Sequence, residues 1–213
     1  MDHPLQILRR AARGALAAAI TAAALATGGC ASLQARLQEL HGPDPDDRVE
    51  ALLALADGVR AGRYEYLRRR PELAAAVRGA LGDPSALVRQ VAVEALADLL
   101  GWPAAGAIAD RLRDADPWVR FTAARVLGEL RATEQRERLE EVLASDDSED
   151  VRRAAARALG RLGAPEARRA LYLALGDPSP AVRFHAQRAL VIIVGRDLGP
   201  DPRAWRQVLF EAR

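Results

Sequence analysis

Apolar residues recur at helical spacing through most of the chain. Between Val88 and Leu99 they stand at positions i, i+4, i+7 and i+11, on one stripe of an α-helix. The same stripe returns at Val119, Ala123, Val126 and Leu130, and at Val151, Ala155, Ala158 and Leu162. The segments between these helices carry pairs of apolar residues four apart, which predict second helices over residues 71–81, 103–112, 134–143 and 165–175. The pattern predicts an all-α chain of alternating first and second helices.

A phrase of similar sequence recurs along the same part of the chain. It reads DPSALVRQVAVEAL from Asp83, and near-copies follow at intervals of 31 or 32 residues, beginning at Asp114, Asp146 and Asp177. A fifth, degraded copy begins at Asp44, with Glu50 in the place of the arginine and Asp57 in the place of the leucine. Repeats of this length stack on one another and bury a continuous core, so the spacing predicts a solenoid.

The repeated phrase resembles the short bacterial HEAT-like repeats of the phycobilisome lyase type, over about residues 44–213. The resemblance implies an α-α superhelix of about five helix pairs. It also implies a ladder of aspartate and arginine side chains, with the matching pairs Asp83 and Arg89, Asp114 and Arg120, Asp146 and Arg152, and Asp177 and Arg183. We interpret the ladder as structural, because a partly buried guanidinium group needs a carboxylate or carbonyl partner. The closing segment resembles the capping end of such proteins, where Trp205 would cover the last core.

The first 32 residues differ from the rest. Three arginines precede an uncharged segment that ends in small residues, which is the order of an export signal. The single cysteine, Cys30, follows directly and resembles the lipidated cysteine of bacterial lipoproteins, although Thr27 stands where that family prefers a large aliphatic residue. We therefore expect a lipoprotein-type signal peptide, an N-terminal tether with a short helix and a solenoid with a C-terminal capping helix, over residues 1–29, 30–43 and 44–213.

Other interpretations of the N-terminus stay open. The chain could be cut near residues 24–26, or residues 14–35, which carry no charge, could stay as a membrane anchor. In a third alternative, Cys30 is a structural cysteine of a cytoplasmic protein.

The charge balance bears on the class of partner. The chain has 31 basic and 29 acidic residues. Removal of a signal peptide takes away three arginines and Asp2, which leaves 28 residues of each sign. Because binding to phosphate groups needs an excess of arginine or lysine on one face, we expect no nucleic-acid partner.

The sequence contains no recognisable catalytic motif. Its three histidines, His3, His41 and His185, lie far apart in the chain and are not predicted to share a site. Metal-ligand spacings, a P-loop, a dinucleotide fingerprint and a nucleophile elbow are all missing from the sequence. We expect no enzymatic activity, no metal ion and no cofactor.

Two departures from the repeat are candidate partner-binding surfaces. The first is an insertion of about eight residues around Arg60 to Glu72, rich in arginine and tyrosine: Arg63, Tyr64, Tyr66, Arg68, Arg69 and Arg70. The second is the exposed face of the second helices, expected on the concave side, where the residues change sharply between repeats: Arg78, Glu137, Glu140, Arg169 and Tyr172. The alternative for the insertion is a helix extension with a solvated basic end. The alternative for the second-helix face is evolutionary drift of its surface residues.

These observations predict a non-enzymatic scaffold for protein–protein interaction. The export signal and Cys30 add the expectation of a lipid-anchored protein at the cell envelope, which faces the periplasm or the cell exterior and binds an unknown envelope protein. Two alternatives stay open: a cytoplasmic bilin lyase or isomerase built of HEAT-like repeats, and a HEAT-like nucleic-acid-binding protein.

Overall fold

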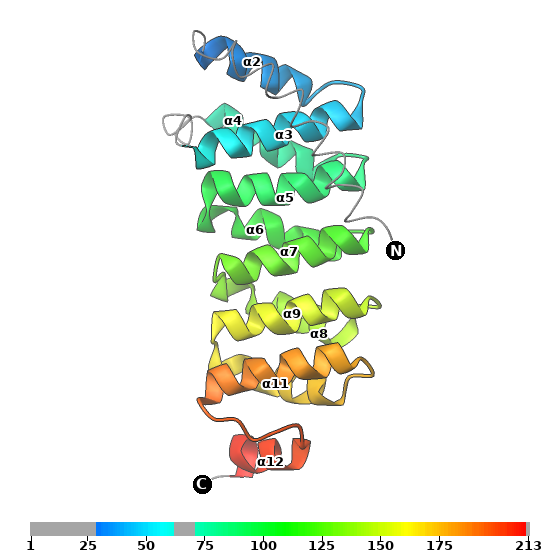
Figure 1. Ribbon diagram of the computed structural model, residues 1–213, viewed down its shortest axis with the longest axis vertical. Coiled ribbons are helices and arrows are strands. Elements are labelled where there is room, and N and C mark those ends of the chain that lie inside the picture. Colours follow the sequence, from blue (N-terminus) through cyan, green and yellow to red (C-terminus); the bar gives the residue numbers. More distant parts are fainter. Residues whose placement is uncertain (1–28, 62–70, 212–213) are drawn as a thin grey trace.

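The protein is a stack of helices arranged in two layers. The computed structural model describes residues 29–61 and 71–211, and within these ranges the regular secondary structure is helical (Figure 1). Helices follow one another as stacked pairs from one end of the molecule to the other. The prediction of an all-α solenoid is confirmed.

The first layer contains the helices that carry the repeated phrase. Each begins directly after an extended residue at the N-cap position. In α3, α7 and α11 a proline in the first turn removes a backbone N–H group that would otherwise be free. Asp44 and Asp116 accept hydrogen bonds from backbone N–H groups through their side chains. Every helix of this layer contacts the next one along the stack. They are α3 (Pro45–Arg60), α5 (Ala86–Leu100), α7 (Pro117–Glu129), α9 (Glu149–Leu162) and α11 (Pro180–Val194).

The second layer consists of shorter helices that alternate between α and 3-10 turns. The ranges agree with the predicted ones to within a few residues, but the sequence pattern did not indicate the breaks. The 3-10 turns tighten the backbone where the chain enters or leaves a short helix. The members are α4 (Pro71–Gly79) with η3 (Ala80–Gly82); η4 (Trp102–Ala104), α6 (Ala105–Ala109) and η5 (Asp110–Arg113); η6 (Thr133–Gln135) and α8 (Arg136–Ser145); and η7 (Pro165–Ala167), α10 (Arg168–Leu173) and η8 (Ala174–Gly176).

Both ends of the stack carry an additional helix. α2 (Gly29–Glu39) packs on α3 at the N-terminal end. At the other end α12 (Pro202–Arg206) contacts α10, and a π turn (Gln207–Glu211) follows it. Trp205 is completely buried, and its indole Nε1 donates a hydrogen bond to the carbonyl oxygen of Gly199 at 2.7 Å. Trp205 therefore closes the core at the C-terminal end, as the sequence predicts.

Small residues let the first-layer helices approach closely. A Cβ atom added to Gly128 would lie 2.7 Å from the Cα of Ala158, and one added to Gly160 would lie 2.8 Å from the Cβ of Ala189. α7, α9 and α11 therefore pack nearly backbone to backbone. The second layer has no such contact among its described glycines, since a Cβ on Gly79, Gly106 or Gly176 would meet nothing within 4 Å.

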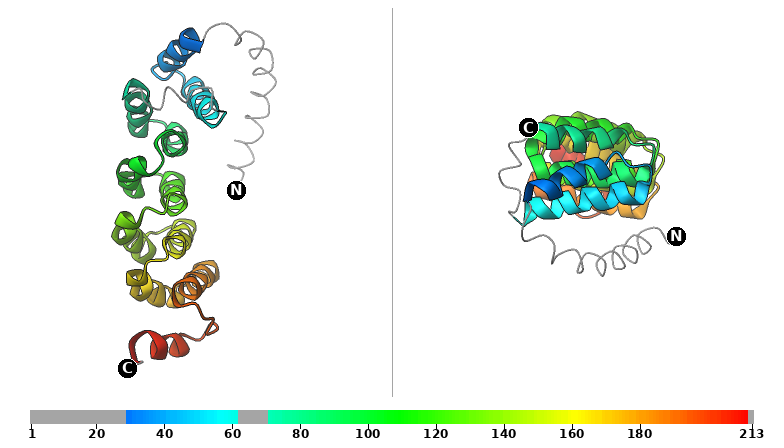
Figure 2. Two further views of the ribbon diagram at one scale, coloured as in Figure 1. Left: turned by 90° about the vertical axis from the view of Figure 1, so that its left-hand side faces the viewer. Right: turned by 90° about the horizontal axis from the view of Figure 1, so that it is seen from above.

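The close packing sets the direction in which the stack bends. Figure 2 shows the helices end on, with the first layer on the inner side of a slight curve. The expectation that the second helices form the concave side is therefore wrong. The layer with the smaller contact residues has the shorter spacing between helices, so it becomes the inner layer.

Substitution of the contact glycines tests this packing. We expect Gly128→Ala and Gly160→Ala each to lower the free energy of unfolding by about 1–3 kcal/mol, because the new methyl group must push two helices apart. Gly106→Ala, in open space on α6, should instead leave stability unchanged or raise it by up to about 1 kcal/mol through helix propensity. Urea denaturation followed by circular dichroism measures all three, and an equal effect in the three variants would contradict the assignment.

Candidate functional site

Arginine and aspartate side chains form a continuous series of ion pairs along the stack. Each arginine reaches the aspartate of the following repeat, through two of its nitrogen atoms and both carboxylate oxygens. The donor–acceptor distances are 2.8 and 3.0 Å for Arg48 with Asp83, 2.8 and 2.7 Å for Arg89 with Asp114, 2.7 and 3.0 Å for Arg120 with Asp146, and 2.8 and 3.1 Å for Arg152 with Asp177. Such two-pronged pairs are the strongest hydrogen-bonded ion pairs in proteins.

The same arginines also hold the start of their own helix. Arg89 Nη1 donates to the carbonyl oxygens of Asp83 and Pro84, at 2.8 and 3.2 Å. Within one repeat, the arginine thus binds the backbone carbonyl of the aspartate. The carboxylate of the same aspartate binds the arginine of the preceding repeat. One guanidinium group therefore links two successive repeats.

The first repeat has a different register from the one that the sequence suggested. Arg48 binds Asp83 and also donates to the carbonyl oxygens of Gly42 and Pro43, at 2.8 and 3.0 Å. Arg48 is therefore the arginine of this repeat and Gly42 stands in the position of the aspartate. Glu50 is exposed. The expectation that Glu50 stands in the place of the arginine is therefore wrong. The cause is that Asp44 stands at the N-cap position of its helix, four residues before Arg48, as Ser85 stands four residues before Arg89. Asp44 therefore does not correspond to Asp83.

Burial and hydrogen bonding act in opposite directions on the ladder carboxylates. Burial by itself raises the pKa of Asp114, but hydrogen bonds from Arg89 and from the backbone N–H of Asp116, with the charges of Arg89 and Arg111, outweigh it. The pKa of Asp114 therefore lies below its usual range. The pKa of Asp177 is lowered in the same way, against the effect of burial, by Arg152, the Ser179 N–H and the charge of Arg183. The charged forms stabilise the folded chain.

The ladder ends at Arg183. Its Nη1 donates to the carbonyl oxygens of Asp177 and Pro178, at 2.7 and 2.9 Å, as in the other repeats. No aspartate of a following repeat binds it in the described part of the chain, and its side chain is exposed. The chain turns into the α12 cap at this point instead.

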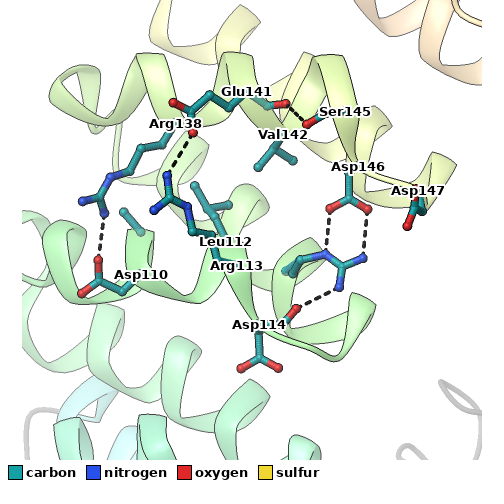
Figure 3. A pocket seen from close by; sticks show the side chains of 12 residues that line it. Asp110, Leu112, Arg113, Asp114, Arg138, Glu141, Val142, Ser145, Asp146 and Asp147 are labelled. Carbon is teal, nitrogen blue, oxygen red and sulfur yellow. Dashed lines mark hydrogen bonds and ion pairs between the residues drawn. The ribbon is translucent and has the colours of Figure 1, made fainter.

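A groove of about 560 Å³ opens between two successive repeats, lined by residues of α6, η5 and α8 (Figure 3). Its charged side chains are largely paired with one another across the groove. Arg138 donates to Asp110 at 2.9 Å, and Arg113 donates to Glu141 at 3.2 Å. Arg120 and Asp146 belong to the ladder. Because these acids and bases neutralise each other, we assign the groove a structural role.

Residues 29–61 and 71–211 contain neither a metal-binding cluster nor a membrane-spanning helix. No cluster of histidine, cysteine, aspartate and glutamate side chains there could hold a metal ion. In the same ranges no helix is both long and apolar enough to cross a membrane.

The predicted binding residues fall into three groups. Six of them lie outside the described residues, as do residues 1–28 of the expected signal peptide: Arg63, Tyr64, Tyr66, Arg68, Arg69 and Arg70. Arg78 and Arg169 are exposed on the second layer. The others have partners within the chain: Glu137 and Glu140 bind Arg136, and the Tyr172 ring packs edge-on against Phe210 at 5.3 Å. The structure thus does not bring the second-layer candidates together into one cluster.

One candidate surface, on the first layer, was not predicted from the sequence. It lies on the solvent side of α9 and α11, and we call it the arginine-aromatic face: Arg153, Arg157, Phe184, His185, Arg188 and Ile192. Burial lowers the pKa of His185, and the charges of Arg153, Arg157 and Arg188 lower it further. Five of the six members, all but His185, stand one, five or nine residues after a ladder arginine, at positions that point away from the core. This spacing was the sequence signal for the face.

Comparison with known proteins agrees with this repeat architecture. The family model described as HEAT repeats matches residues 103–154 and 137–205. Residues 103–205 therefore match HEAT repeats. Sequence comparison with curated proteins gives no match.

Solved structures with similar folds have different functions. The complex of CpcE and CpcF of phycocyanin lyase from Nostoc sp. PCC7120 has a TM-score of 0.62 and 21% identity, over 77% of this chain and 65% of that chain. A designed armadillo repeat protein in complex with the peptide (KR)4 has a TM-score of 0.57 and 19% identity, over 76% and 82%. Human deoxyhypusine hydroxylase in complex with glycerol has a TM-score of 0.52 and 30% identity, over 58% and 44%. This chain covers 65% of the phycocyanin lyase chain, which is less than two thirds of its length.

Removal of one ladder charge tests the role of the ion pairs. At pH 7 we expect Asp114→Asn to lower the free energy of unfolding by about 3 kcal/mol, because the partly buried Arg89 loses its charged partner. Asp147→Asn, a similar change at an exposed carboxylate near the ladder, should change it by less than about 0.5 kcal/mol. Urea denaturation compares the variants, and equal losses would contradict a ladder-specific effect.

The ladder also predicts how stability depends on pH. Because the pKa of Asp114 is lower in the folded chain than in the unfolded chain, its charge stabilises the fold above the unfolded value of about 4. This contribution is lost as the pH falls through the folded pKa. The stability difference between the wild type and Asp114→Asn should therefore shrink steadily between about pH 5 and pH 2. A constant difference across denaturation curves in this range would exclude Asp114 as the titrating group.

Proposed function

We propose that the protein is a non-enzymatic scaffold that binds another protein along its stacked helices, and that it does so at the cell envelope, anchored by a lipid on Cys30. HEAT repeats are a protein-interaction type of α-solenoid, which supports the first part. The second part is supported by the sequence of the N-terminal segment.

The observation that carries the binding role is the contrast between the interior and the faces of the stack. The interior is cross-linked from repeat to repeat by four two-pronged ion pairs, from Arg48–Asp83 to Arg152–Asp177. The outward positions of the helices change from one repeat to the next in charge and size. A surface that is already ordered loses little conformational entropy on binding, which favours affinity for a partner. The armadillo structure in complex with a peptide gives a precedent for a related stack.

The proposed anchor follows from the chemistry of the N-terminus. Arginines, an uncharged segment and small residues lead to Cys30 in the order of a lipoprotein signal. Acyl chains attached to this thiol would each contribute about 0.8 kcal/mol per buried methylene group, and more than one chain is needed for a stable anchor. α2 and the stack would then follow directly behind the membrane surface.

A bilin lyase or isomerase is a second candidate function, which the similarity to phycocyanin lyase favours. It needs a cytoplasmic protein that holds a chromophore. Co-expression with a bilin-producing pathway tests it, since a lyase of this kind should purify with visible absorbance and the proposed scaffold should not.

Mass spectrometry of the N-terminal peptide from native membranes tests the anchor. We expect a diacylated or triacylated Cys30 as the first residue, and release of Cys30→Ala from the membrane fraction, because the thiol that carries the lipid is gone. Ser32→Ala keeps the thiol and should stay with the membrane. An intact Met1 in a soluble pool would disprove export.

Crosslinking in the envelope fraction tests the scaffold function. A photoreactive amino acid placed at exposed first-layer or second-layer positions should give one defined protein adduct, and it should do so only along the contacted face. Positions on the opposite layer are the internal control. If no position gives a defined adduct at native expression levels, the scaffold proposal fails.

A further inference from the structure

The arginine-aromatic face carries positive charges that have no acidic partner among the described residues. Elsewhere in the first layer, the equivalent arginines are paired with glutamates. In the middle of the stack Arg125 binds Glu94 and Glu129, and Arg161 also binds Glu129. Arg157 and Arg188 occupy the position of Arg125 in the next two repeats, and neither forms a hydrogen bond or an ion pair within the described part of the chain. Arg153, by contrast, forms an ion pair with Asp150 at 2.5 Å. The face therefore has an excess of exposed guanidinium groups.

Large apolar side chains lie beside these charges. Phe184 is 57% exposed and its ring packs edge-on against His185, at 5.3 Å between centroids. Ile192 is 60% exposed on the same helix, two turns further on. On α7 the Phe121 ring faces the guanidinium carbon of Arg153 at 6.0 Å. Single exposed apolar residues are ordinary, but arginine combined with aromatic side chains is enriched where interfaces bind most strongly.

The arrangement of this face suits an extended segment. It lies on the first layer, on the inner side of the curve (Figure 2). α9 and α11 lie next to each other in this layer, so the arginine positions form a row across the helices. An elongated ligand that crosses the helices would meet Arg157 and Arg188 in succession and Phe184 beside them.

We propose that the arginine-aromatic face binds an acidic segment of the partner protein, in which an apolar or aromatic side chain docks against Phe184 and Ile192 while carboxylates pair with Arg157 and Arg188. This inference rests on the proposed scaffold function. Charge complementarity selects carboxylates, and the exposed apolar pair selects a side chain that gains from leaving water. A nucleic acid fits less well, since its binding depends on many contacts between phosphates and basic side chains, and this face offers only Arg157 and Arg188 without an acidic partner in the described part of the chain.

Synthetic peptides test the chemistry of the proposed ligand. The probes are three fluorescein-labelled 12-residue peptides: one with alternating glutamate and leucine or tryptophan, one with glycine in place of the apolar residues, and one with arginine in place of glutamate. A 20-nucleotide single-stranded DNA is the fourth probe. In fluorescence anisotropy at about 0.15 M salt, we expect the full chain to bind the acidic-apolar peptide at least ten times more tightly than the other three.

Charge reversal locates the binding site. We expect Arg157→Glu with Arg188→Glu, and separately Phe184→Ala, to weaken the acidic-apolar peptide at least ten-fold. The matched control is Arg78→Glu with Arg169→Glu, which makes the same change of charge at exposed positions of the second layer and should leave binding within two-fold. The milder pair Arg157→Gln with Arg188→Gln replaces the reversal if the latter does not fold, as judged by circular dichroism.

The possible outcomes separate this inference from the scaffold function. Any of four results would overturn the acidic-segment inference. They are an equal loss of binding in the control pair, equal binding of the glycine peptide, tighter binding of the DNA, and no binding of any peptide. Crosslinking of the envelope fraction then decides the function independently. If a defined adduct persists in Arg157→Glu with Arg188→Glu, the protein is still a scaffold, but the arginine-aromatic face is not its binding surface.

Discussion

The helical stack depends on one recurring interaction, the ion pair that joins the arginine of one repeat to the aspartate of the next. The guanidinium group is suited to it because its planar donors serve a carboxylate on one side and two backbone carbonyls on the other. Arg120 thus fixes the start of its own helix and the distance to the following repeat at once. A single lysine could not make both contacts with this geometry. The repeats are therefore coupled by directed bonds as well as by apolar packing.

The curve of the stack follows from a second constraint, the size of the residues between neighbouring first helices. Gly128 and Gly160 allow backbone contact with Ala158 and Ala189, so the first layer is the more closely spaced one. The ladder fixes successive repeats at the helix starts, and the glycines fix them near the helix ends. Together they orient the outward positions of α9 and α11 in a row, which is what gives the arginine-aromatic face its continuity.

The fold alone does not define the function. Structures that share the stack include a phycocyanin lyase complex, a hydroxylase and a designed peptide-binding repeat protein, so the architecture accommodates different tasks. In this chain the functional information lies in the side chains that the core does not use. On the second layer Glu137 and Glu140 are paired with Arg136, and Tyr172 packs on Phe210. On the first layer Arg157 and Arg188 keep their donors available. This difference is the reason to place the binding face there.

The sequence by itself determined the helices, their pairing and the repeat length, because the apolar stripe and the Asp…Val-Arg phrase are local signals that recur in register. It also identified Trp205 as the closing residue. Only the tertiary structure decided which carboxylate each arginine binds, since Arg89 and Asp114 are 25 residues apart and a phrase contains both residue types. It also decided that Arg48, and not the residue at position 50, continues the ladder. The structure also decided which layer is concave and that His185 lies on the same face as three arginines. Both depend on the distances between neighbouring helices, and the periodicity within one helix gives no information about these distances.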